Sequence, residues 1–163
     1  LKCLCVKEVL KLKNIEFLLG DFMLYLKKPN LYFDMVFASG VLYHMKEPLL
    51  LLELISRITN KLFIWTHYFD DSIIRSNHLM DKKFHDIQTM DYKGKDYQYS
   101  SQSYGEALNW AGFCGGPSSE SKWMTRESLM NALHEFGFQT ITCNFENTHH
   151  PNGPSLALCA SKE

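Results

Sequence analysis

The amino-acid sequence predicts an α/β domain built on a sheet whose strands are connected through helices. Apolar runs of strand length alternate with segments in which apolar residues recur at helical spacing. The strand-like run at residues 33–38 passes through a short turn into an apolar helix, and another strand-like run follows that helix. The 163 residues are 45% hydrophobic and 21% charged, which suits one globular core.

The first two predicted elements are an amphipathic helix at residues 5–13 and a short buried strand at residues 15–19. The helix is predicted because Val6, Val9 and Leu10 recur at helical spacing. The strand is a compact apolar run, and the Gly-Asp pair after it marks its end.

The stretch at residues 33–48 is the most informative part of the chain. Its strand ends at a turn formed by Ser39 and Gly40. In a doubly wound sheet, ligands bind at the carboxyl ends of the strands. Residues 39–44 are therefore the first place to look for function.

The next elements continue the same pattern of strand and crossover. Pro48 stands where a first-turn proline is tolerated, and it opens a helix predicted at residues 48–60. This helix is too apolar to be exposed and is expected to lie on the sheet. The apolar run at residues 62–66 supplies the following strand.

The chain is predicted to end in a helix and two strands. Thr125 is the expected N-cap of the helix, and Gly137 closes it. A turn rich in Gly and Pro separates the two strands. The helix is predicted at residues 126–136. The two strands are predicted at residues 139–145 and 156–160, with the turn at residues 151–154.

The sequence Phe-Asp-Met-Val-Phe-Ala-Ser-Gly-Val-Leu-Tyr-His at residues 33–44 resembles the fourth strand and following loop of class I S-adenosylmethionine-dependent methyltransferases. Its Gly-Val-Leu-Tyr-His loop is most similar to the branch that includes tRNA wobble-uridine modifying enzymes. The resemblance spans about residues 15–162. It implies a Rossmann-like doubly wound sheet of the class I methyltransferase type, ending in an antiparallel hairpin.

The resemblance also implies that part of the fold is missing. The family's opening strand, its glycine-rich loop and the acidic residue ending its second strand have no counterpart here. Residues 1–163 are therefore expected to form a single methyltransferase-like domain that is incomplete at the N-terminus and lacks the first βαβ segment. The strand at residues 15–19 would lose its neighbours, so we expect either altered packing or a homodimer through the exposed sheet edge.

S-adenosylmethionine is the cofactor that the resemblance implies. Asp21 and Phe22 are expected to hold its adenine, because a carboxylate accepts a hydrogen bond from an amine and an aromatic ring offers a stacking face. Ser39, Gly40 and Val41 are expected to line its methionine end. The alternative for Asp21 is a turn residue that caps the next helix.

Tyr43 and His44 are the expected catalytic residues, facing the crevice between cofactor and acceptor. His44 is a candidate general base for an oxygen or nitrogen acceptor, because imidazole titrates near neutral pH. Helix capping or packing is the alternative role. Methyl transfer itself needs little acid or base, since alignment of donor and nucleophile supplies most of the acceleration.

Residues 67–123 are predicted as the longest irregular region, rich in aromatic and turn residues. The resemblance places a lid or acceptor-binding insertion here. The alternative is a satellite hydrophobic cluster under a long loop. The residues expected to bind the acceptor, by stacking, excluding water or pairing with an acidic group, are His67, Tyr104, Trp110, Trp123 and Arg126.

Composition argues against several other classes. The formal net charge of −1 supplies no global field for nucleic acid, so RNA binding would need a local patch. Five cysteines form neither a disulfide framework nor a zinc motif, which favours a reducing cytoplasm. The histidine spacing matches no metal signature, no Gly-x-Ser-x-Gly elbow occurs, and no apolar stretch is long enough to span a membrane.

Two functions stay open from the sequence. The first is a methyltransferase acting on an acceptor that is either a small molecule or RNA. The second is a non-catalytic fragment or binding module without a complete cofactor site. The acceptor itself is not readable from these residues, because one fold serves many substrates.

Overall fold

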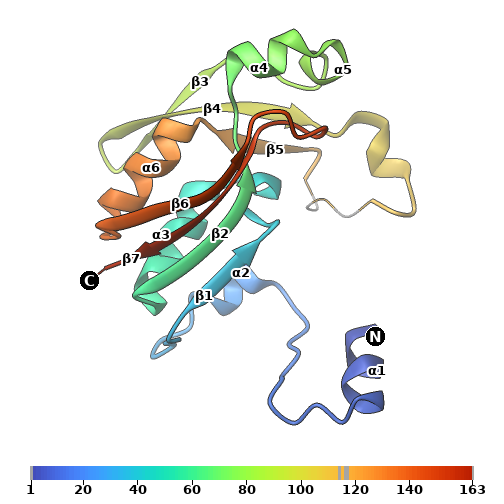
Figure 1. Ribbon diagram of the computed structural model, residues 1–163, viewed down its shortest axis with the longest axis vertical. Coiled ribbons are helices and arrows are strands. Elements are labelled where there is room, and N and C mark those ends of the chain that lie inside the picture. The colour runs from blue at the N-terminus through green and yellow to red at the C-terminus, as the bar shows by residue number, and fades with distance from the viewer. Residues whose placement is uncertain (1, 114, 116–117, 163) are drawn as a thin grey trace.

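The computed structural model describes residues 2–113, 115 and 118–162. In chain order, the elements are α1 (Lys2–Val9), α2 (Phe22–Tyr25), β1 (Val36–Ser39), η1 (Leu42–His44), α3 (Pro48–Ile58), β2 (Lys61–His67), α4 (Asp71–Ser76), α5 (His78–Asp81), β3 (Gln88–Tyr92), β4 (Lys95–Ser103), η2 (Gly105–Asn109), β5 (Glu120–Met124), α6 (Arg126–Glu135), β6 (Thr140–Asn147) and β7 (Ser155–Ser161). The strands form two sheets, in the orders β1-β2-β7-β6 and β3-β4-β5. Figure 1 shows the second sheet lying across one end of the first. The predicted α/β class is confirmed.

The four-stranded sheet joins a parallel pair to an antiparallel hairpin. β1 runs parallel to β2 and ends with Ser39 opposite Trp65. β7 lies between β2 and β6 and runs antiparallel to both, with a bulge in β6 between Cys143 and Phe145. The crossover through α3 and the terminal hairpin therefore form as the sequence predicts.

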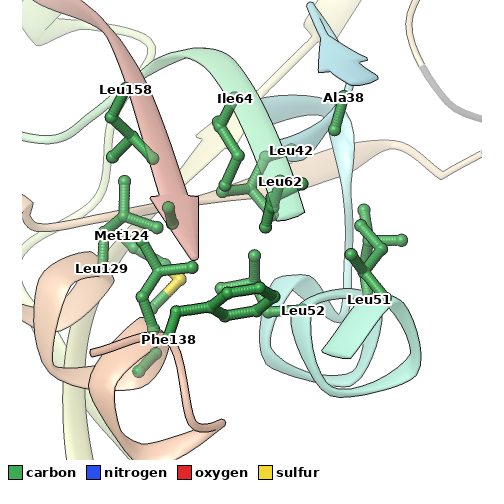
Figure 2. Packing of buried hydrophobic residues seen from close by; sticks show 14 of the residues in the cluster. Ala38, Leu42, Leu51, Leu52, Leu62, Ile64, Met124, Leu129, Phe138 and Leu158 are labelled. Atoms are coloured by element: carbon green, nitrogen blue, oxygen red, sulfur yellow. The ribbon is translucent and has the colours of Figure 1, made fainter. Parts of the chain in front are cut away.

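The main core lies between this sheet and the helices α3 and α6 (Figure 2). Leu52 of α3, Leu62 of β2 and Phe138 are all fully buried there. Burying one such side chain stabilises the fold by roughly 1.5–3 kcal/mol. Pro48 occupies the first turn of α3, and the Thr125 hydroxyl oxygen accepts from the Ser128 N–H of α6 at 3.2 Å, so the predicted starts of both helices are confirmed.

The opposite side of the sheet is more open. Phe37 of β1 and Phe63 of β2 stack with ring centroids 4.2 Å apart, and Phe37 is 68% exposed. Phe145 and Cys159, on the terminal hairpin, are exposed as well. This apolar surface of the sheet therefore reaches solvent in the described structure.

The prediction of a buried strand at residues 15–19 is wrong. This segment has no regular secondary structure, Leu18 is largely exposed and Leu19 is fully exposed. α1 precedes it and buries none of its residues, and it covers residues 2–9 rather than the predicted 5–13. An apolar run becomes a strand only when a neighbour pairs with its backbone, and none of the described strands does so.

The prediction of an irregular region at residues 67–123 is also wrong for most of its length. β3 and β4 form a hairpin whose two turn residues, Lys93 and Gly94, both have positive φ, and β5 completes the sheet. The Lys122 N–H donates to the Met45 carbonyl at 2.9 Å, next to η1. The Phe69 N–H, just beyond β2, donates to the Met124 carbonyl at 2.9 Å. The second sheet is thus fastened at the carboxyl ends of β1 and β2.

A buried carboxylate also ties the second sheet to α3. Glu53 of α3 is 6% exposed and accepts hydrogen bonds from the Lys93 ammonium at 2.7 Å, from the Tyr92 hydroxyl at 2.5 Å and from Arg57. Burial alone would raise the pKa of Glu53, but these donors together lower it to about 2. The ionised carboxylate therefore holds the β3–β4 hairpin against the helix.

Candidate functional site

The candidate site forms where the chain leaves β1. Gly40 has φ +72°, a left-handed conformation that favours glycine, and its N–H donates to the Trp65 carbonyl at 2.9 Å. The turn leads directly into η1, where buried Leu42 anchors the loop. Tyr43 and His44 are thereby placed beside the end of β2.

Five rings from four parts of the chain meet here, and we call them the aromatic-imidazole cluster: Tyr43, Trp65, His67, Trp123 and His150. The His67 and Trp123 rings stack almost in parallel, with centroids 4.9 Å apart and planes 11° apart. The Tyr43 ring meets the His67 ring edge-on, with centroids 4.7 Å apart. The His150 ring also meets the His67 ring edge-on, with centroids 4.9 Å apart. Trp65 completes the group at 5.2 Å from His67. His67 is therefore the centre of the cluster.

The protonation state of His67 follows from its hydrogen bonds. Its Nδ1 lies 2.9 Å from the Gly153 carbonyl oxygen and 3.2 Å from that of Pro154. Because a carbonyl only accepts, Nδ1 carries the hydrogen and Nε2 carries the lone pair in the neutral ring. Burial lowers the pKa of His67, which keeps this neutral form at pH 7.

Gly153 is a site residue that sequence reasoning did not identify. Its φ is +103°, and a Cβ at this position would lie 2.7 Å from Met80 Cε and 2.9 Å from Trp123 Cζ3. Only glycine lets the β6–β7 turn approach so closely. The Pro-Asn-Gly-Pro sequence signalled the turn itself, but its contact with His67 is long-range and leaves no local sequence signal.

His44 joins η1 to η2. Its Nδ1 lies 2.9 Å from the Tyr104 hydroxyl oxygen, and the two ring centroids are 6.3 Å apart. Burial lowers the pKa of His44, so the imidazole is neutral at pH 7. Two predicted site residues, separated by 60 positions in the sequence, therefore lie in direct contact.

The predicted acceptor-binding residues fall into two groups. His67, Tyr104 and Trp123 lie at the site, although Trp123 is only 2% exposed and its indole N–H has no hydrogen-bond partner among the described residues. Trp110 is 67% exposed, and Arg126 pairs with Glu146 of β6 at 3.0 Å. Within the part of the chain that the structure describes, neither Trp110 nor Arg126 has a ring contact or hydrogen bond to the aromatic-imidazole cluster.

Asp21 and Phe22 lie at the start of α2. The Asp21 Oδ1 accepts from the N–H groups of Met23 at 2.8 Å and Leu24 at 3.3 Å, so Asp21 is the N-cap of this short helix. Phe22 is 45% exposed. An open cavity of about 420 Å³ is lined by Leu18, Leu19, Gly20, Asp21, Phe22, Leu24, Tyr25 and Lys28.

Among the described residues, no group of three or more His, Cys, Asp or Glu side chains is arranged to hold a metal ion. No helix within the residues that the structure describes is long and apolar enough to cross a membrane.

Comparisons with known proteins find similarity at the level of structure. No model of a known protein family matches the chain, and no curated protein matches it. The fold is similar to the N-terminal domain of EvdMO1 with SAH bound, with a TM-score of 0.73 and 24% identity over 99% of this chain. The same domain in the presence of SAH and D-fucose gives a TM-score of 0.73 at 23% identity over 99% of this chain and 61% of that one.

The chain covers only part of each of these structures. The chain spans 60% of the SAH-bound domain, and it spans 28% of EvdMO1, whose structure gives a TM-score of 0.61 at 23% identity over 98% of this chain. At this level of identity the likeness establishes the fold. The chain therefore shares its fold with part of a domain that was crystallised with SAH.

Proposed function

We propose that this chain is part of an S-adenosylmethionine-dependent methyltransferase domain. The observation that carries the proposal is the structural likeness, over 99% of the chain, to a domain crystallised with SAH, which we take to be S-adenosylhomocysteine. The position of Ser39 to His44 at the carboxyl end of β1 supports it, because ligands bind at this edge of such sheets.

The residues present suit the cofactor in two places. The cavity at α2 offers the Asp21 carboxylate for the adenine amine and the half-exposed Phe22 ring for stacking. Ser39, Gly40 and Val41 are assigned to the methionine end, where glycine allows close approach of the backbone. When bound, the cofactor supplies an electrophilic methyl group.

His44 is assigned as the base, with Tyr104 as its positioning residue. In the tautomer with hydrogen on Nδ1, His44 donates to the Tyr104 oxygen and keeps the Nε2 lone pair for the acceptor's proton. A depressed pKa keeps the base unprotonated at neutral pH. Tyr43 is the member of the cluster whose ring contacts His44, and it also packs against His67 and Trp123.

The first test is calorimetry and thermal unfolding of the whole chain with S-adenosylhomocysteine. A ligand that binds only the folded state adds about 2.7 kcal/mol at 100 times its dissociation constant. We expect saturable binding with one site per chain and a higher Tm. A cooperatively folded sample that neither binds nor shifts would contradict the proposal for this chain.

The alternative is a non-catalytic fragment or binding module that keeps half of the sheet. The observation that favours it is the closure of the cluster, since His67 and Trp123 are 5% and 2% exposed. The same calorimetric experiment separates the two functions, because a module without a cofactor site gives no saturable heat.

The proposed acceptor is a small molecule or RNA, and the proposed compartment is a reducing cytoplasm, consistent with free thiols at Cys3, Cys5, Cys143 and Cys159. The dimer expected through residues 15–19 loses its basis, because these residues form no strand. β1 and β6 are the edge strands of the four-stranded sheet, and we propose that any homodimer forms along β1, the edge that follows the segment at residues 15–19. Sedimentation showing only monomer across micromolar concentrations would contradict it.

A further inference from the structure

We propose that a small cavity beside Tyr104 binds the phosphate group of a phosphorylated small-molecule acceptor. The inference rests on the proposed methyl transfer and names the class of molecule that would receive the methyl group. The cavity has a volume of about 230 Å³ and lies between the end of α5 and the segment joining β4 to η2. Its lining residues are Lys82, Lys83, Gln102, Ser103, Tyr104, Gly105 and Ala107.

The walls of this cavity are held in place by backbone contacts. The Ser103 N–H donates to the Lys83 carbonyl at 2.8 Å, which fixes the two sides of the cavity to each other. Phe84, the next residue, is buried with its ring 4.8 Å from Trp123. The lysine backbone is therefore anchored to the same core that supports the aromatic-imidazole cluster.

The charged residues that line the cavity are basic. They are Lys82 and Lys83, and no Asp or Glu is among the lining residues. Within the described residues Lys82 and Lys83 form no ion pair, whereas Lys93 pairs with Glu53 and Lys95 with Glu135. Gln102 and Ser103 add side-chain donors. An anion with several acceptor oxygens is the ligand that such a lining recognises.

The cavity is also next to the proposed base. Tyr104 lines the cavity and has its hydroxyl oxygen 2.9 Å from His44 Nδ1. A molecule whose phosphate lies on Lys82 and Lys83 would therefore extend past a single tyrosine ring to reach His44. That arrangement would place the reacting oxygen or nitrogen of the acceptor by holding its opposite end.

A small phosphorylated molecule fits this lining better than RNA does. Proteins that bind a nucleic-acid backbone use a basic surface that follows several phosphates. Here only two lysines line one compact cavity, and the whole chain carries a net charge of −1.

The test is calorimetric titration of the whole chain with inorganic phosphate at low ionic strength. The variant is Lys82→Ala combined with Lys83→Ala. The matched control is Lys11→Ala combined with Lys13→Ala, which removes two exposed charges from the N-terminal segment. We expect saturable binding, weakened at least 10-fold by the first pair of substitutions and less than 2-fold by the second. Both variants should retain the wild-type Tm, since these are surface substitutions.

Three results would overturn the inference. The first is the absence of saturable phosphate binding, and the second is equal weakening of phosphate binding in both double variants. The third is that a uridine hexamer without terminal phosphate binds through Lys82 and Lys83 more tightly than inorganic phosphate does. S-adenosylhomocysteine is titrated into the same samples. If the wild-type chain binds S-adenosylhomocysteine but not phosphate, this inference alone is contradicted. If it binds phosphate but not S-adenosylhomocysteine, the proposed methyl transfer is contradicted.

Discussion

The two halves of the proposed cofactor site belong to regions that are held very differently. Around η1, backbone hydrogen bonds connect residues distant in sequence, including Lys122 to Met45 and Tyr68 to Pro154. The segment before β1 contrasts with this. α1 has no buried residue, and Figure 1 shows it standing away from both sheets.

The difference indicates which residues cofactor binding would order. The residues assigned to the methionine end leave a strand of the main sheet, whereas those assigned to adenine lie on α2, which contacts the core through Met23 and Leu26. Elements that bind ligands are often drawn from the less stable parts of a fold. We therefore expect cofactor binding to order residues 15–28 much more than η1.

The largest contrast is expected from removing the same side chain in each region. Leu52→Ala deletes a fully buried side chain from α3 and should lower the free energy of unfolding by about 2–5 kcal/mol. Leu19→Ala changes a fully exposed residue and should cost less than about 0.5 kcal/mol. Urea unfolding of both variants measures this. Similar losses in the two would mean that the N-terminal segment packs against the core in solution.

The next effect is a dependence of stability on pH through Glu53. Its folded pKa of about 2 is below the ordinary value of 4.5, so its contribution is present above about pH 4.5 and is lost as pH falls toward 2. The depression corresponds to about 3 kcal/mol. Glu53→Gln should therefore reduce stability at pH 7 and flatten its dependence between pH 5 and 2.5.

Glu16→Gln is the control for Glu53, because Glu16 is exposed in the N-terminal segment. It should leave the unfolding free energy at pH 7 and its fall with acid unchanged. Thermal unfolding at several pH values tests both variants. If Glu53→Gln kept the wild-type acid dependence, the ion cluster between α3 and the β3–β4 hairpin would contribute no net stability.

A smaller loss is expected at Gly153. Gly153→Ala introduces a Cβ against Met80 and Trp123 at a positive φ, so it should cost about 1–3 kcal/mol and disturb the carbonyl that holds His67. Gly94→Ala is the matched variant, because its φ is +79° but nothing lies within 4 Å of the added Cβ. Equal losses in the two would show that backbone strain accounts for the whole effect.

Sequence patterns located the elements whose signals are local. The α3 and α6 helices start at Pro48 and after Thr125 as predicted, because first-turn proline and N-cap hydroxyl are determined by neighbouring residues. The run at residues 15–19 misled because strand formation depends on a distant partner. β4 was missed because its sequence is polar and serine-rich, although Tyr97 and Tyr99 are buried.

The candidate site shows the same division. Tyr43 and His44 were predicted from the turn after β1, and the structure brings His67, Tyr104 and Trp123 close to them. The contributions of His150 and Gly153 were not found. Their role depends on a contact between the β6–β7 turn and the end of β2, across 86 residues for the Gly153–His67 hydrogen bond.

The smallest effect on stability, and the sharpest test of the weakly held region, is at Asp21. Asp and Asn are equivalent N-caps, whereas Ala leaves the first N–H groups of α2 without a partner at a cost of about 1 kcal/mol. Asp21→Asn therefore keeps the cap and removes the charge. If Asp21 binds adenine, Asn should weaken S-adenosylhomocysteine binding several-fold, because hydrogen bonds to a charged acceptor are about twice as strong as neutral ones.

The pair Asp21→Asn and Asp21→Ala then separates recognition from structure. Should Asn bind like the wild type while Ala alone binds weakly, Asp21 would serve α2 only as a cap, and adenine recognition would have to come from Phe22 and its neighbours. Calorimetry measures both affinities. Weakening in both variants, with Ala the weaker, would assign the carboxylate to the ligand and show that a loosely packed helix start contributes directly to cofactor affinity.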